Sequence, residues 1–309
     1  MDLSQRVIRS SIDWSGAGIT LADYLAGRFT YRSKDEWCKR IASGEIMLND
    51  KIVSPETILA LHDKIEYRPA DIAEPPADLD YRIVYEDDTT LVIDKPGNLC
   101  MHPAGPFFKH TLWHLLCSRY GNIHFVNRLD RETSGLLLAA KDAATAKKLS
   151  KSVLKKKYLV LAHGEFPEEL EAEGFLLSAN SVVRKKRRFQ YDMPDAPPFE
   201  SARTFFRKLD FVNGLSVIEA ELFTGRMHQI RATLFSLGYP VAGDKLYGLD
   251  ENFYLKQRSD ELTESDREKL LLSRQALHSA YLEFTGISGE KLFFSSPMPD
   301  DMKKLITEN

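Results

Sequence analysis

The chain of 309 residues carries 42 lysines and arginines against 45 aspartates and glutamates, a formal net charge of −3, and 43% of it is hydrophobic. This composition excludes a globally disordered chain, and no apolar run approaches the roughly 20 residues that cross a bilayer. The start lacks the apolar stretch of a secretory signal. Cys38, Cys100 and Cys117 lie too far apart for a disulfide framework or a metal-binding spacing. We therefore expect a cytoplasmic protein without a metal site, with about two domains.

The first 70 residues are predicted to form a small α+β module, preceded over residues 1–16 by a loose arm. In residues 20–27, Leu21, Tyr24 and Leu25 share one face of a helix. The other elements expected in the module are a helix over 34–44 with Trp37 and Ile41 inward, a hairpin over 45–53 that turns at Asn49-Asp50, and a strand over 63–68.

Residues 71–80 are predicted to be a linker, because prolines cluster around them at 69, 75 and 76 and no apolar period is present. The larger domain is expected over 81–309. Its strand-like runs lie at 90–95, 135–140, 157–164, 202–209 and 215–222. They are not interleaved with regular helices, which favours an α+β fold with a mixed, largely antiparallel sheet over a doubly wound one.

Two helices are predicted in this domain next to segments rich in polar residues. The first runs from Asp142, as N-cap, to Leu154, with Ala146, Leu149 and Val153 inward. The second covers 228–237 and is ended by a glycine and a proline at 238 and 240.

A dense polar cluster precedes the apolar run at 135–140. Arg128, Asp130, Arg131 and Glu132 cannot be buried unpaired at reasonable cost, so we expect a loop at the edge of the sheet. The cluster fits a functional site and equally a structural turn with surface ion pairs.

A second polar segment opens the helix at 228–237. His228 and Arg231 are three residues apart and share a face, so Arg231 could point at a carboxylate from another segment. Backbone N–H groups at the helix start would also favour an anion. The alternative is that these residues only cap the helix. His228 is expected to be hydrogen-bonded rather than a metal ligand.

Positive charge is unevenly distributed along the chain. Residues 141–160 hold seven lysines against one acid, and residues 184–188 are five consecutive cations. Since phosphate binding depends on the local field rather than on net charge, these runs fit a nucleic-acid partner. Each run alone also fits an ordinary solvated face.

Five segments together resemble the RluA family of pseudouridine synthases. The run NRLDRETSGLLLAAKD (127–142) is similar to its HRLD-type active-site motif, KKKYLVLAHG (155–164) to its second motif, and TGRMHQIRATLFSLGYPVAGDKLYG (224–248) to its third. LVIDKPGNLCMHP (91–103) and RQALHSAYLEF (274–284) match further family segments in the same order. GEIMLND (44–50) in the N-terminal module resembles the signature of an S4 RNA-binding domain.

The resemblance implies an isomerase that converts uridine in ribosomal or transfer RNA to pseudouridine without a cofactor. Asp130 matches the catalytic aspartate, Arg231 its basic partner, and Tyr158 the tyrosine that stacks on the flipped base and is a candidate for removing the C5 proton. Arg128 would fill the gap left by the flipped uridine or hold the RNA backbone. The remaining residues expected to bind RNA are Asn127, Lys156, Lys185, Lys186, Arg187, Arg188, Arg226 and His228.

Two positions depart from the family pattern, and two other function classes stay open. Asn127 stands where histidine is usual, and Met227 where threonine is usual. A non-catalytic RNA-binding protein could keep the fold. A carbohydrate or nucleoside hydrolase built on Asp130 would need a second carboxylate. We expect a monomer that acts on RNA and binds neither a membrane nor a small-molecule cofactor.

Overall fold

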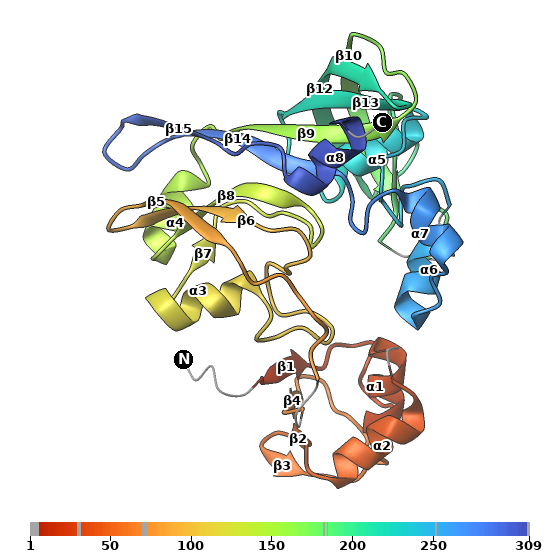
Figure 1. The fold of residues 1–309 in the computed structure, drawn as a ribbon. Helices are drawn as coiled ribbons and strands as arrows, with labels where there is room; N and C mark the ends of the chain where they lie inside the picture. The colour runs from red at the N-terminus through yellow and green to blue at the C-terminus, as the bar shows by residue number, and fades with distance from the viewer. Residues whose placement is uncertain are drawn as a thin grey trace. The chain divides into compact units, whose positions relative to one another are not determined.

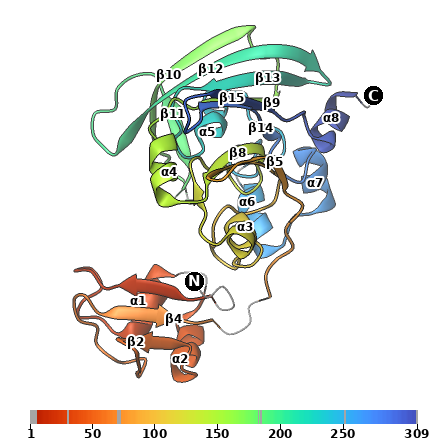
Figure 2. The same ribbon diagram turned by 90° about the vertical axis from the view of Figure 1, so that its left-hand side faces the viewer.

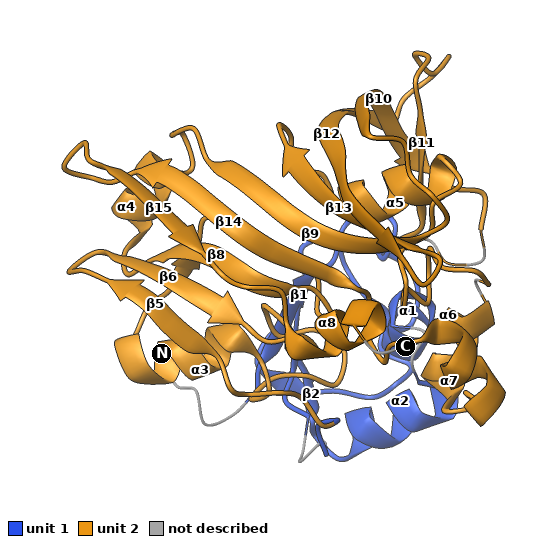
Figure 3. Cartoon of the chain, turned by 45° about the horizontal axis from the view of Figure 1, so that its top comes forward, with its two compact units in different colours: residues 1–75 blue, residues 76–309 orange. Residues whose placement is uncertain are grey.

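The computed structural model describes residues 6–29, 32–69, 73–181, 183, 185–250 and 252–307. The chain divides into two compact units, residues 1–75 and residues 76–309 (Figure 3). The division falls within the segment expected to be a linker, of which residues 71 and 72 lie outside the described residues, as do residues 1–5 of the expected arm.

Where the structure describes it, unit 1 is a four-stranded sheet in the order β1-β4-β2-β3 with two helices (Figure 2). Its elements are β1 (Ile8–Ser11), α1 (Leu21–Arg28), α2 (Lys34–Ala42), β2 (Ile46–Leu48), β3 (Lys51–Ile52) and β4 (Lys64–Tyr67). The side chains of Thr20 and Ser33 cap the two helices by accepting N–H groups of the first turn. Trp37 and Ile41 are fully buried, as their spacing predicts.

The β2–β3 hairpin turns at Asn49 and Asp50, which both have positive φ, 50° and 63°. This backbone matches the twist of the flanking strands, and asparagine and aspartate tolerate it better than most residues. The predicted hairpin therefore has its physical cause in the turn dipeptide.

The expectation of a loose arm over residues 1–16 is wrong where the structure describes it. Ile8–Ser11 pair antiparallel with Lys64–Tyr67, and Ile12 is only 1% exposed in the core of unit 1. A strand of four residues is too short to show a period, and its partner lies more than 50 residues away.

Unit 2 contains an eleven-stranded sheet in the order β11-β10-β12-β13-β9-β14-β8-β6-β5, with β15 beside β14 and β7 beside β8 (Figure 1). The strands are β5 (Arg82–Glu86), β6 (Thr90–Lys95), β7 (His124–Phe125), β8 (Ser134–Ala140), β9 (Lys155–His163), β10 (Glu169–Ser178), β11 (Arg187–Gln190), β12 (Phe199–Val212), β13 (Leu215–Leu222), β14 (Leu277–Thr285) and β15 (Lys291–Ser295). Among the described strand pairs only β8 and β14 run parallel. The predicted mixed, largely antiparallel sheet is thus confirmed.

The helices of unit 2 are α3 (Leu112–Tyr120), α4 (Ala143–Leu149), α5 (Gln229–Ser236), α6 (Asn252–Ser259), α7 (Glu264–Leu270) and α8 (Asp300–Thr307). α4 packs beside β8, and α5 packs against β11 and β10. Asp142 caps α4 as predicted, but the helix ends at Leu149 rather than Leu154, and Val153 is 86% exposed. The chain has to leave the helix there because β9 begins at Lys155.

The junction of β8 and β14 places the polar loop that precedes β8. All seven residues of β8 are buried, and Ser134 and Gly135 pair with His278 and Ser279 of β14. Gly135 has φ +105°, and a Cβ there would lie 2.3 Å from the carbonyl oxygen of Ser279. Only glycine allows this approach, so the loop enters the sheet at a fixed point.

We predict that residues 76–309 fold on their own. Each unit has its own hydrophobic core: that of unit 2 includes Val92, Leu136 and Leu282, and that of unit 1 includes Trp37. The truncated chain should be soluble and melt cooperatively by circular dichroism.

In the full chain, Trp37→Ala should destabilise unit 1 by about 3–5 kcal/mol and leave the melting of unit 2 in place. An insoluble fragment, or one transition that shifts as a whole, would contradict two independent units.

Candidate active site

The loop between β7 and β8, which carries Asp130, is held from behind by the buried Lys95. The Lys95 ammonium donates to the carbonyl oxygens of Pro96 (2.8 Å), Leu99 (3.1 Å) and Arg131 (3.0 Å). Burial lowers the pKa of Lys95 to about 7. Three carbonyls thus satisfy its three donors, and the loop is tied to the end of β6.

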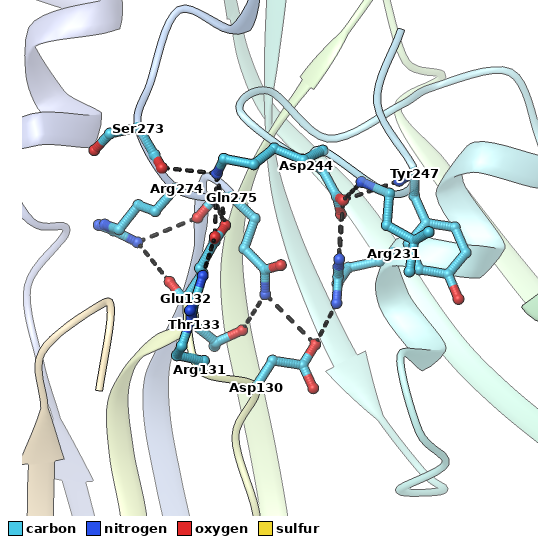
Figure 4. A network of polar contacts seen from close by, with 12 residues as sticks. Asp130, Arg131, Glu132, Thr133, Arg231, Asp244, Tyr247, Ser273, Arg274 and Gln275 are labelled. Atoms are coloured by element: carbon cyan, nitrogen blue, oxygen red, sulfur yellow. Dashed lines mark hydrogen bonds and ion pairs between the residues drawn. The ribbon is translucent and has the colours of Figure 1, made fainter. Parts of the chain in front are cut away.

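A second set of contacts holds the loop through Glu132 (Figure 4). Its carboxylate accepts from Lys245 at 3.0 and 3.1 Å and from the backbone N–H of Gln275 at 3.2 Å. The Gln275 side chain donates to Thr133 Oγ1 at 2.5 Å. The segment at 245–275 therefore fixes the conformation of the residues on the C-terminal side of Asp130.

Asp130 pairs with Arg231 of α5, which lies 101 residues later in the chain. Arg231 Nη1 donates to Asp130 Oδ2 at 2.7 Å, and the Gln275 amide lies 3.5 Å from the same oxygen (Figure 4). Burial by itself would raise the pKa of Asp130, but the Arg231 charge and hydrogen bond outweigh it and hold the pKa below its usual value. The carboxylate is therefore ionised at neutral pH, and its side chain is still 30% exposed.

Arg231 is held on its other side by Asp244. Its Nε and Nη2 donate to the two Asp244 oxygens at 2.6 and 2.9 Å, and Asp244 also accepts the backbone N–H groups of Leu246 and Tyr247 at 2.9 Å each. Burial opposes the charge on Asp244, yet Arg231 keeps the pKa of Asp244 low. Sequence reasoning missed Asp244 as a site residue, although it lies within the motif-like segment 224–248.

A cavity of about 480 Å³ opens in front of the Asp130–Arg231 pair. It brings together eight of the predicted site residues, from segments far apart in the chain: Asn127, Arg128, Asp130, Lys156, Tyr158, Arg226, His228 and Arg231. Asp130 is the one carboxylate among the described residues that line it. The site can therefore present one anionic oxygen to a molecule about the size of a nucleotide.

Tyr158 and Lys156 reach this cavity from β9, two residues apart and thus on the same face of the strand. Tyr158 is 5% exposed, and burial raises its pKa to about 12, so its hydroxyl is protonated at neutral pH. Burial lowers the pKa of Lys156. Among the described residues no carboxylate lies within ion-pair distance of Lys156.

Comparison with known proteins identifies the family. The model of the RNA pseudouridylate synthase family matches residues 89–236. The ribosomal large subunit pseudouridine synthase D of Nitrosomonas europaea is 31% identical over 283 residues, which is 88% of this chain and 77% of the relative. The chain belongs to the RluA family of RNA pseudouridine synthases. It is an isomerase that acts on RNA.

Other relatives differ in substrate or are more distant. The mitochondrial tRNA pseudouridine(32) synthase of Saccharomyces cerevisiae is 30% identical over 237 residues. The match covers 75% of this chain and 51% of the yeast protein. The structure of human RNA pseudouridylate synthase domain containing 1 superposes with a TM-score of 0.54 at 24% identity, covering 72% of this chain and 86% of the human chain. That likeness concerns the fold.

In the basic run at 184–188, fewer cations are exposed to solvent than the sequence indicates. Lys186 is only 7% exposed, with its ammonium 4.7 Å from the centre of the Phe235 ring, and Arg187 pairs with Glu200 at 2.5 Å. Lys185 and Arg188 are exposed, and position 184 lies outside the described residues. Lys186 lies just before β11 and packs on the Phe235 ring of α5, so the run of cations does not face water as a whole.

The lysine-rich segment at 141–160 is also partly neutralised. Lys141, Lys155 and Lys157 pair with Glu86, Glu221 and Glu219, respectively. The exposed lysines of this segment lie on and just after α4, at 147, 148 and 151.

Asn127, where the family usually has histidine, has a structural contact. Its Oδ1 accepts the backbone N–H of Leu138 in β8 at 2.8 Å.

Arg226, which lines the cavity and is exposed, donates from Nε to the carbonyl oxygen of Ser201 at 3.1 Å.

The described ranges contain no cluster of three or more His, Cys, Asp or Glu side chains placed to bind a metal ion. Within the same ranges, no helix has both the length and the apolar character needed to cross a membrane.

We predict that Asp244→Asn destabilises unit 2 by about 3–5 kcal/mol, because it leaves the buried Arg231 with an uncompensated charge on one side. Urea denaturation of the fragment 76–309 measures this. Glu171→Gln is the matched control: Glu171 pairs with Arg203 on the surface, where both side chains are 45% exposed, and its replacement should cost less than about 1 kcal/mol. Equal destabilisation in the two variants would show that the Arg231–Asp244 pair has no special role.

Proposed function

We propose that this synthase flips a uridine of a structured ribosomal or transfer RNA into the cavity, where Asp130 acts on C1′. The observation that carries the proposal is the Asp130–Arg231 pair. Arg231 holds Oδ2 at 2.7 Å and keeps the pKa of Asp130 low, which leaves Oδ1 as the anionic oxygen directed at the cavity. A carboxylate in this state can attack C1′ or stabilise positive charge there.

The other residues of the cavity would bind and orient the nucleotide. Tyr158 would stack on the flipped uracil and is the candidate for removing the C5 proton. Because its hydroxyl is protonated, it would take that proton while giving up its own, which balances the proton that N1 gains in pseudouridine. The exposed Arg128 would occupy the place that the base leaves, since flipping costs a few kcal/mol of stacking and pairing. Lys156 and Arg226 would contact phosphates beside the target.

The lining of the cavity disfavours a glycoside or nucleoside hydrolase. Such enzymes use two carboxylates, one of them as the acid for the leaving group. Asp130 alone serves among the described lining residues. An isomerase has no such need, because uracil stays in the pocket and rejoins the ribose through C5.

For the RNA target we infer a substrate class, and for the cellular setting a compartment. The relatives named above are synthases for the ribosomal large subunit and for tRNA, and we propose ribosomal or transfer RNA as the substrate class here. Unit 1 is proposed to be an S4-like RNA-binding domain that adds affinity for a large structured RNA. We propose a monomer that acts in the cytoplasm, without a cofactor.

Asp130→Asn is expected to abolish pseudouridine formation while folding and RNA affinity stay near wild type, because the amide keeps the size of the side chain but not its charge. The assay is tritium release from transcripts of large-subunit ribosomal RNA and tRNA that contain [5-³H]uridine. Asp210→Asn, at an exposed position of β12, is the control. Activity of Asp130→Asn within tenfold of the control would refute this role.

Replacing Lys185 and Arg188 together by glutamine should weaken RNA binding without changing the rate on bound RNA. For each phosphate interaction that the substitutions remove, the slope of log K against log salt should fall by about 0.7–0.9. The control removes the same charge from the exposed Lys269 and Lys304 of α7 and α8. If both double variants bind RNA alike at every salt concentration, Lys185 and Arg188 form a solvated face only.

A further inference from the structure

His228 occupies an unusual position at the start of α5. Its backbone is left-handed, with φ 58° and ψ 20°, and its side chain makes no capping hydrogen bond. A non-glycine residue in this conformation costs free energy, and such residues concentrate at functional sites. The imidazole lines the cavity instead, with Nε2 3.9 Å from Asp130 Oδ1.

The neighbouring Tyr247 determines which imidazole nitrogen carries the proton. The Tyr247 hydroxyl oxygen accepts the backbone N–H of Arg187 at 2.8 Å and lies 3.0 Å from His228 Nδ1. Among the described contacts of the Tyr247 hydroxyl, His228 Nδ1 is the one acceptor for the hydroxyl proton, so we assign the hydroxyl as donor and Nδ1 as acceptor. With Nδ1 as acceptor, a neutral imidazole carries its hydrogen on Nε2, the nitrogen closer to Asp130.

The imidazole is neutral at the pH of the reaction. Burial lowers the pKa of His228 to about 4, against the attraction of Asp130 and Asp244 and with the help of Arg231 and Lys185. In this neutral state Nε2–H is available as a hydrogen-bond donor toward the cavity, and the imidazole has no extra proton to give.

We propose that His228 is a catalytic residue whose Nε2–H donates to O2 of the flipped uracil while the N1–C1′ bond breaks. This inference rests on the proposed function. The bonding pair of N1–C1′ stays with uracil, and the resulting negative charge is shared between N1 and O2. Asp130 Oδ1 bonds to C1′ in the covalent route, or removes the C2′ proton in the glycal route. The uracil anion forms in both, so the donor serves both.

The geometry fits this assignment. Two bonds separate O2 from N1, and N1 is bonded to C1′, so a donor to O2 has to lie within a few ångströms of the oxygen that acts on C1′. Donors aimed at developing negative charge in a water-poor site are worth about 10²–10³ in rate. His228 would thus take the part that a second acid plays in a hydrolase, with no proton transferred.

The test compares His228→Leu, which has no donor, with His228→Gln, whose amide keeps one. The RNA carries a single target uridine, mapped beforehand with the wild-type enzyme, and pseudouridine formation is followed in single turnover with saturating full-length enzyme. We expect His228→Leu to react about 100-fold more slowly, with RNA affinity within threefold of wild type. His228→Gln should keep at least a tenth of the wild-type rate.

A substrate change locates the contact. The same RNA is ligated with 2-thiouridine at the target position, which replaces O2 by a weak sulfur acceptor. The wild-type rate should fall at least tenfold, whereas the rate of His228→Leu should fall by less than a further threefold, because the hydrogen bond is already gone. Such coupling between one side chain and one substrate atom does not arise from a purely structural role.

Two results would overturn the proposal. One is a rate for His228→Leu within threefold of wild type; the other is an equal effect of 2-thiouridine on both enzymes, which also decides the case if His228→Leu is less stable. Either result leaves the role of Asp130 untouched, because Asp130→Asn would still be inactive. Failure of the proposed function itself would appear earlier, as a wild-type enzyme that converts no uridine in either RNA class.

Discussion

The site depends on a chain of three charges, Asp130–Arg231–Asp244, in which Arg231 and Asp244 are buried and Asp130 is partly exposed. A guanidinium has five donors in a rigid plane, and here one edge binds the fully buried Asp244 while Nη1 reaches Asp130. Because Asp244 already holds Arg231 in place, Asp130 meets an oriented partner, and its charge survives in surroundings that would otherwise raise its pKa. Asp244 does not line the cavity, so it acts on Asp130 only through Arg231.

The loop around Asp130 is held by a residue next to Asp244 in the chain. Neighbouring residues of opposite charge, Asp244 and Lys245, hold Arg231 and Glu132, which belong to different elements. One peptide unit therefore relates the basic partner of Asp130 to the loop that carries Asp130. The positions of Asp130 and Arg231 are thus coupled through the adjacent residues Asp244 and Lys245 and their ion pairs.

Several elements of the fold and three residues of the site could be predicted from the sequence, because local patterns and family motifs indicate them. β6 and the helices α1, α2 and α5 follow from periodicity and capping, and the motif residues Asp130, Tyr158 and Arg231 do line one cavity. The failures share a cause. The strand β1 and the early end of α4 depend on partners distant in sequence. Lys95, Lys186 and Asp244 look like surface charges in a sequence, and only the fold reveals that they are buried.

Asp244 and Gln275 come later in the chain than Asp130 and Arg231, so they are synthesised after the pair that they hold. The similarity to the family model ends at residue 236, which includes Asp130 and Arg231 but neither residue that secures them from behind. A nascent chain released up to that point carries Asp130, Tyr158 and Arg231. It lacks Asp244, which neutralises the second edge of Arg231, and Gln275, which steadies the loop. The Asp130–Arg231–Asp244 arrangement with its Gln275 contact can therefore form only after the chain has been synthesised through β14, which pairs with β8.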